Sequence, residues 1–90
     1  MALTAKVKQQ LKGQAHKLKP VVFIGIKGLT KSVLKEIDQA LDAHELIKVR
    51  IQGEDREARR LIFAEISTLS SAALVQTIGS IGVFYRKCEE

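Results

Sequence analysis

Two glycines three residues apart, with a lysine between them, make up the part of this sequence best suited to bind an anion. They form the segment Gly25-Ile26-Lys27-Gly28, which follows an apolar run and precedes a predicted helix. Glycine lets a ligand approach the backbone closely, and a helix start presents unpaired N–H groups with partial positive charge. Lys27 and Lys31 add full positive charges nearby. The segment is therefore either a tight strand-to-helix turn or a loop that holds a negatively charged group.

Lys31 favours an anion-binding loop, because a lysine at the start of a helix is unfavourable for the helix itself. The glycine spacing matches neither G-x-G-x-x-G nor G-x-x-x-x-G-K-[ST], so the sequence does not indicate a dinucleotide or P-loop nucleotide site. The phosphates of an extended polynucleotide fit better, since single-strand RNA modules of KH type clamp the backbone with a GxxG loop.

The distribution of charge also points to a polyanion. Residues 1–35 contain eight lysines and no acidic residue, whereas residues 36–90 contain seven Lys/Arg and ten Asp/Glu. The net charge of +5 is therefore +8 followed by −3, and a region of one sign attracts polyanions. A solvated lysine-rich helix face is the alternative. With three Phe, one Tyr and no Trp, base stacking is not expected to be the main source of affinity.

Other chemistry finds little support in the sequence. His16 and His44 have no Ser, Cys or paired carboxylate in step with them, so packing or capping is favoured over a general-base role. Cys88 is the only cysteine, which excludes an intramolecular disulfide and makes a zinc site or a nucleophile unpromising. No apolar segment is long enough to span a bilayer. We expect a cytoplasmic protein that is not an enzyme and uses no metal, cofactor or small-molecule substrate.

The apolar spacing predicts seven elements in one domain covering residues 1–90. Three helices are expected, over residues 3–17, from Thr30 to about residue 43, and after a cap at Asp55. Strands are expected over residues 21–24 and 45–51, and a closing hairpin should turn at Gly79-Ser80. The order is helix, strand, helix, strand, helix, strand, strand. Parallel crossovers followed by an antiparallel hairpin give an α/β fold, a compact sandwich with a four-stranded mixed sheet packed by helices.

The same patterns predict the core. Residues 21–24 are apolar throughout, which suits a strand buried on both faces. In the next strand Lys48 and Arg50 alternate with apolar residues, so the helices should mainly cover the face opposite these two cations. Truncation of Phe23 to Ala should then cost about 3–5 kcal/mol. The predicted core residues are Val21, Val22, Phe23, Ile24, Ile47, Val49 and Leu61.

Two long segments resemble the CRM-domain family, in particular its small stand-alone bacterial YhbY-like members. They are "LKGQAHKLKPVVFIGIKGLTKSVLKEIDQALDAHELIKVRI" and "QTIGSIGVFYR", and together they span most of the chain. The resemblance implies a fold similar to the C-terminal domain of bacterial translation initiation factor three. It also implies RNA binding and association with ribosomal RNA or with precursors of the large ribosomal subunit.

Within this resemblance, the family's GxxG loop corresponds to residues 25–28, and its basic surroundings correspond to Lys12, Lys19, Lys48 and Arg86. Ile26 is bulkier and more apolar than the residue often found there, and it either packs under the loop or touches a base or ribose. Many bacterial members continue past "YR" with a basic tail, whereas this sequence reads Lys87-Cys88-Glu89-Glu90. RNA contacts of such a tail are therefore not expected.

The sequence leads to the hypothesis of a monomeric RNA-binding protein in large-subunit assembly. Loop amides and the following helix would hold a phosphate while further cations follow the RNA backbone. The candidate RNA-binding residues are Gly25, Ile26, Lys27, Gly28, Lys31, Lys12, Lys19, Lys48, Arg50 and Arg86. The main alternative is a protein-interaction module of the translation machinery that docks acidic protein surfaces. A small nucleotide-using enzyme is a second alternative, which the missing phosphate motifs disfavour.

Overall fold

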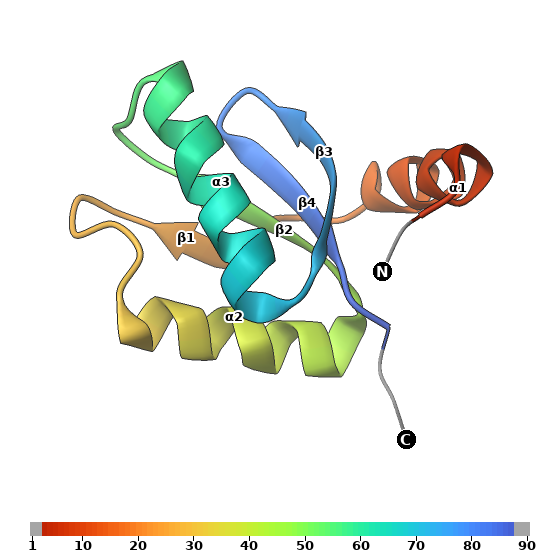
Figure 1. Cartoon of the computed structure of the whole chain (residues 1–90), viewed down its shortest axis with the longest axis horizontal. Helices are drawn as coiled ribbons and strands as arrows, with labels where there is room; N and C mark the ends of the chain where they lie inside the picture. Colours follow the sequence, from red (N-terminus) through yellow and green to blue (C-terminus); the bar gives the residue numbers. More distant parts are fainter. Residues whose placement is uncertain (1–2, 88–90) are drawn as a thin grey trace.

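The computed structural model describes residues 3–87 and contains seven elements in the predicted order (Figure 1). The elements are α1 (Ala5–Ala15), β1 (Val22–Ile24), α2 (Lys31–His44), β2 (Leu46–Ile51), α3 (Arg56–Ser70), β3 (Ala73–Ile78) and β4 (Ile81–Tyr85). The first helix is shorter at both ends than residues 3–17.

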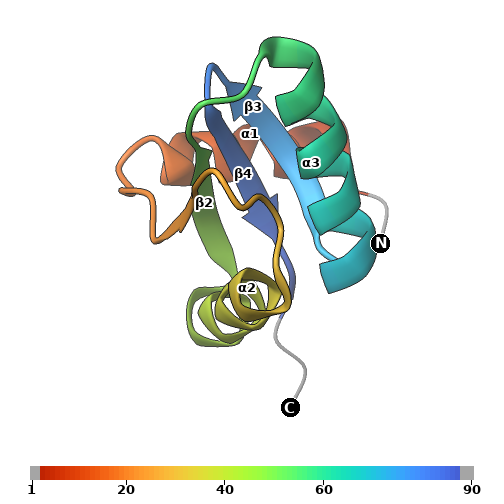
Figure 2. The same cartoon turned by 90° about the vertical axis from the view of Figure 1, so that its left-hand side faces the viewer.

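The strands form one mixed sheet in the order β1-β2-β4-β3, which confirms the predicted fold class. β1 is parallel to β2, and β4 is antiparallel to both β2 and β3. The carboxyl ends of β1 and β2 therefore lie at one edge of the sheet, where the Ile51 N–H donates to the Ser80 carbonyl and the Gln52 N–H to the Ile24 carbonyl. The loop after β1, the start of α3 and the β3–β4 turn all adjoin this edge, and Figure 2 shows the start of α3 and the β3–β4 turn at the top.

Side-chain caps and a glycine turn set the boundaries that the sequence predicted. Thr30 Oγ1 accepts from the Val33 N–H at 3.1 Å, and Asp55 Oδ1 accepts from the Ala58 N–H at 2.8 Å. Each bond satisfies an N–H that has no partner inside its helix. Gly79 opens the β3–β4 turn with φ of 57°, a conformation that favours glycine, so the predicted hairpin is confirmed.

The larger core lies between the sheet and the helices α2 and α3. Ile37 and Leu41 of α2 are fully buried there against β1 and β2. The rings of Phe63 and Phe84 pack with centroids 6.0 Å apart and planes tilted by 56°. A Cβ at Gly82 would lie only 2.7 Å from the Phe63 ring, so this strand position has to be glycine for α3 to sit this close to the sheet.

A second, smaller core lies on the other face of the sheet under α1. Leu11 and Ala15 pack there against Leu46, Val75 and Val83, and Figure 1 shows the strands separating α1 from the other two helices. Lys48 and Arg50 project from the same face as Leu46, because alternate residues of a strand share a face. Two helices thus cover the predicted face, but the third lies on the face that carries these cations.

The prediction that β1 is buried on both faces is wrong. Val22 and Ile24 are fully buried, but Phe23 between them is 62% exposed and Val21 is 44% exposed. β1 is an edge strand that packs against α2 on one face only, whereas α1 packs against β2 and β3 and leaves the other face of β1 uncovered. An unbroken apolar run therefore alternates between buried and exposed positions.

Leu61 is also not a core residue, because it is 56% exposed. The apolar residues at the centre of α3, Leu61-Ile62-Phe63, allow two overlapping stripes that differ by one residue. The structure buries the stripe of Phe63 and Ile66, since the Phe63 ring fits over Gly82. Of the seven predicted core residues, four are buried as expected: Val22, Ile24, Ile47 and Val49.

Truncation of Phe84 should therefore cost much more stability than truncation of Phe23. Phe84→Ala is expected to lower the free energy of unfolding by about 3–5 kcal/mol, because it empties a fully buried site. Phe23→Ala should cost less than about 1 kcal/mol, since a strand-surface substitution changes little beyond β propensity. Urea denaturation followed by circular dichroism measures both values. A larger loss for Phe23→Ala than for Phe84→Ala would contradict this fold.

Candidate nucleic-acid interface

The GIKG loop, residues 25–28, is a tight turn with an exposed tip. The Gly28 N–H donates to the Gly25 carbonyl at 3.0 Å, and Gly28 has φ of 72°, where a side chain would be strained. Gly25 has no such requirement. Ile26 is 96% exposed, so it does not pack under the loop and instead projects into solvent beside Lys27.

The start of α2 provides hydrogen-bond donors next to this turn. Thr30 satisfies the N–H groups of Val33, through its hydroxyl, and of Leu34, through its carbonyl. The N–H groups of Lys31 and Ser32 belong to the first helical turn, which an α-helix cannot satisfy internally. The first turn of α2 contains no acidic residue. An anion at this position would meet the free backbone N–H groups and the positive end of the helix dipole. The exposed ammonium groups of Lys27 and Lys31 lie nearby.

Four cations form a strip that leads across the sheet to the loop; we call Lys19, Lys48, Arg50 and Lys27 the basic strip. Lys19 precedes β1, at the sheet edge opposite the loop. Lys48 and Arg50 project from one face of β2 about 7 Å apart along the strand. Lys27 stands at the loop tip. The basic strip runs parallel to β2, which is about 20 Å long.

One hydrogen bond and a shared hollow define the surroundings of Lys48 in the middle of this strip. Lys48 Nζ donates to the Leu18 carbonyl at 2.9 Å, which holds the segment after α1 against β2. Lys12 and Lys48 line the same hollow between α1 and the sheet, together with His16. His16 itself ends α1, where its backbone N–H donates to the Lys12 carbonyl. The structure therefore brings Lys12 to the basic strip and gives the backbone of His16 a capping position.

Arg86 lies at the opposite edge of the sheet from the loop and is held by the protein itself. Its Nη1 donates to Asp38 Oδ1 at 2.6 Å and to the Ser70 carbonyl at 2.9 Å, and its Nη2 donates to Asp42 Oδ1 at 2.8 Å. Its side chain is only 20% exposed. The hydrogen bond to Asp38 is the largest cause that raises the pKa of the Arg86 guanidinium, while burial acts in the opposite direction. Arg86 thus ties β4 to α2 and α3, away from the loop.

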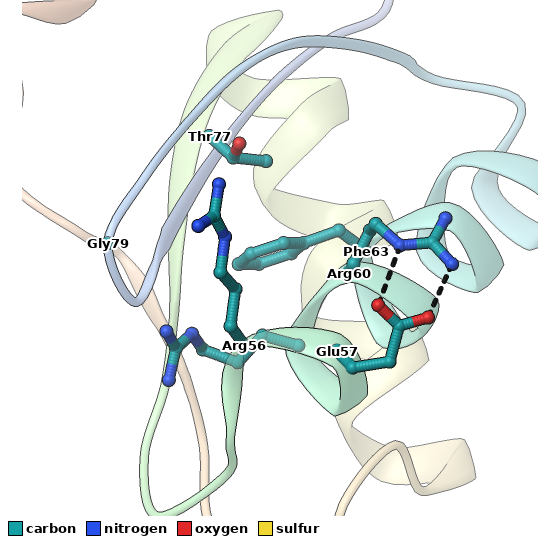
Figure 3. Close-up of a pocket in the computed structure, with 7 residues that line it drawn as sticks. Arg56, Glu57, Arg60, Phe63, Thr77 and Gly79 are labelled. Atoms are coloured by element: carbon teal, nitrogen blue, oxygen red, sulfur yellow. Dashed lines mark hydrogen bonds and ion pairs between the residues drawn. The ribbon is translucent and has the colours of Figure 1, made fainter.

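Sequence reasoning missed a cluster of three arginines, Arg56, Arg59 and Arg60, at the start of α3. They line a hollow with Phe63 and the β3–β4 turn (Figure 3). Arg60 is paired with Glu57 at 2.6 Å, and its hydrogen bond lowers the pKa of the Glu57 carboxyl. Arg59 donates to the Glu54 carbonyl. Arg56 is exposed at the same sheet edge as the GIKG loop. The sequence feature that could have predicted this cluster is the presence of three arginines within residues 56–60.

The remaining candidates add no site. Among residues 3–87, no three His, Cys, Asp or Glu side chains are grouped so that they could hold a metal ion. No helix in this described range is long and apolar enough to cross a membrane. His44 is exposed at the end of α2, and Cys88 lies outside the described residues.

The fold and the basic loop edge define the class to which this protein belongs: a small α/β domain with a GxxG turn between its first strand and second helix. The family model of the CRS1/YhbY (CRM) domain matches residues 3–86. The chain belongs to this family, as the resemblance in its sequence predicted.

Relatives in several bacteria match almost the whole chain. An RNA-binding protein of Haemophilus influenzae is 56% identical over 98% of this chain and 89% of its own length. A protein of Bacillus subtilis named as a probable RNA-binding protein is 36% identical over 98% and 92% of the two chains. The solution structure of a candidate RNA-binding protein from Staphylococcus aureus superposes with a TM-score of 0.86 at 35% identity, covering 99% of this chain and 93% of that one.

Replacing Arg86 by Ala should destabilise the protein by about 1–3 kcal/mol, because hydrogen bonds from a charged group to two helices are lost. Arg60→Ala is the matched control, since its ion pair joins two largely exposed side chains and should leave stability unchanged within error. Chemical denaturation of both variants measures the difference. Wild-type stability in Arg86→Ala would show that the network has no structural role.

Proposed function

We propose that this protein binds RNA through the GIKG loop, the first turn of α2 and the basic strip. The observation that carries the proposal is the convergence at one sheet edge of an exposed glycine turn, unsatisfied helix amides and the side chains of Lys27 and Lys31. The names of the relatives support RNA as the ligand, since they describe RNA-binding proteins.

In the proposed mechanism, one phosphate of the RNA backbone docks at the loop. It accepts hydrogen bonds from the N–H groups of Lys31 and Ser32, and the helix dipole and Lys27 stabilise its charge. Neighbouring phosphates then follow the basic strip along β2, with Lys12 at its side. Arg56 extends the surface from the start of α3. Arg86 is not part of this footprint, because its guanidinium is engaged within the fold.

We further propose that the RNA is ribosomal and that the protein acts on precursors of the large ribosomal subunit, as the family resemblance implies. In this proposal the protein is a cytoplasmic monomer. Residues 1–90 form one domain, and the protein is not an enzyme. The alternative is a protein-interaction module of the translation machinery. The positive charge of residues 1–35 also suits an acidic protein surface, so this alternative predicts a protein rather than RNA as the ligand.

Binding to RNA should weaken steeply as salt concentration rises, because lysine–phosphate contacts release counterions. Each lysine removed from the footprint should reduce the slope of log affinity against log salt by roughly 0.7 for a single strand. Fluorescence anisotropy with labelled RNA at several potassium chloride concentrations measures the slope for wild type and Lys48→Ala. A slope near zero for the wild-type protein would falsify the electrostatic mechanism.

Changing both loop lysines tests whether the GIKG loop is a phosphate clamp or only a turn. Lys27→Glu combined with Lys31→Glu should sharply reduce RNA affinity, because two charges facing the phosphate change sign. The fold should be retained or slightly stabilised, since Lys31→Glu places an acid at the start of α2. RNA binding and thermal melting are measured on the same preparations.

The control is a double variant with the same charge change on the exposed end of α1, Lys6→Glu with Lys8→Glu. It should lose less affinity, because these lysines lie outside the basic strip. Sedimentation of cell extracts then tests the ribosomal target: wild type should migrate with large-subunit precursors and the loop variant should not. Equal RNA affinity in the loop variant and wild type would reduce the loop to a structural turn.

A further inference from the structure

One row of side chains crosses all four strands near the loop edge, and α1 borders it only at Ile78, which lines a hollow with Lys12. The strand register places Phe23 beside Arg50, Arg50 beside Ile81, and Ile81 beside Ile78. Arg50 lies on the face that carries Lys48 and Leu46, so the row belongs to the face covered by α1. α1 packs over Leu46, Val75 and Val83, which lie further from the loop edge.

The exposure in this row is large for apolar side chains. Phe23 is 62% exposed and Ile78 is 53% exposed, and Ile26 at the adjoining loop tip is 96% exposed. Phe23 is an aromatic ring on an edge strand with its neighbours Val22 and Ile24 completely buried, so the backbone alternation holds the ring outward. Arg50 is exposed at its side. The fold gains little from an aromatic residue in this position.

The surroundings of Phe23 match the chemistry of an unpaired nucleotide. An exposed ring and an adjacent guanidinium give a base a surface to stack on, and cations surround both. Phe23 lies two residues before Gly25, which directly follows the end of β1, so the ring is about 7 Å along the chain from the start of the GIKG loop. A base on Phe23 and a phosphate at the loop are therefore neighbours on the protein surface.

We propose that Phe23 stacks against an unpaired base of RNA whose backbone is held at the GIKG loop, with Arg50 flanking the base. The inference rests on the proposed RNA binding and makes it narrower: the ligand of this face is single-stranded. In a duplex each base is stacked between its neighbours and cannot lie flat on the ring, so duplex RNA gains nothing from Phe23. The scarcity of aromatic residues agrees with this, because one stacked base adds to an affinity that is mainly electrostatic.

The test uses the full chain and a labelled single-stranded RNA of about 12 nucleotides, alone and annealed to its complement. Phe23→Ala and Phe23→Leu should weaken single-strand binding about 5- to 100-fold, the loss expected for one stacked base. Phe23→Tyr should retain the affinity. Duplex affinity and the salt slope should stay the same in every variant, because no charge is changed.

Leu61→Ala is the matched control, since Leu61 is similarly exposed but lies on α3, which packs on the other face of the sheet. It should leave single-strand affinity unchanged. A second measurement does not depend on lost affinity: the sequence contains no tryptophan, so Phe23→Trp introduces the only one. Its fluorescence should be quenched by the single strand through stacking and not by the duplex, whereas Leu61→Trp should respond to neither.

The outcomes separate this inference from the proposed function. If wild type binds the single strand with a steep salt slope and Phe23→Ala binds equally well without quenching in Phe23→Trp, only the stacking inference is overturned. Full affinity in Phe23→Leu would also overturn it, because leucine keeps apolar contact without an aromatic face. Loss of self-association in Phe23→Ala with unchanged RNA affinity would assign the face to a second copy of the chain. Absence of RNA binding by wild type would overturn both proposals.

Discussion

The parallel pairing of β1 with β2 beneath α2 is the constraint on which the rest of the interface depends. Val22 and Ile24 are fully buried between the sheet and α2, and this burial fixes which residues of β1 face inward. A shift of one residue would expose both and bury Phe23, so the register is strongly specified. The same pairing ends β1 and β2 at one edge, where the GIKG loop leads from β1 into α2 and the next loop leads from β2 into α3.

Some cations of the protein form ion pairs within the fold, and others are exposed to solvent. Arg86 holds β4 against α2 and α3 through Asp38, Asp42 and the Ser70 carbonyl, at the edge of the sheet away from the loop. Arg60 is paired with Glu57 on the surface of α3. Lys27 and Lys31 are exposed at the loop edge instead. A simple count of basic residues would have overstated the surface available to a polyanion, because the ion pairs within the fold neutralise part of it.

The limited size of α1 gives the sheet two unlike faces. α2 and α3 cover most of one face with the larger core, while α1 covers only part of the other. The uncovered part is a mixed surface in which Phe23 and Ile78 flank Arg50 and Ile81. Electrostatic contacts with phosphates distinguish single-stranded from duplex RNA only weakly. In the proposed complex, stacking of an unpaired base on Phe23 would favour the single strand.

The sequence by itself determined the order of the elements, the caps at Thr30 and Asp55, the glycine-first hairpin turn and the family. These features are local, and their signals are residue types at short spacings. It also indicated which face of β2 carries the larger core, because Lys48 and Arg50 mark the other face.

Only the tertiary structure decided the roles of residues whose local pattern was ambiguous. The apolar run at residues 21–24 contains no polar residue to mark its exposed side, and Phe23 faces solvent because α1 does not reach β1. The apolar residues of α3 allow two overlapping stripes, and the packing of Phe63 over Gly82 selected the one with Phe63 and Ile66. Arg86 looked like part of a basic surface, but its acidic partners are 44 and 48 residues away in the chain. Contacts between distant segments carry no signature at short spacing, so these assignments required the fold.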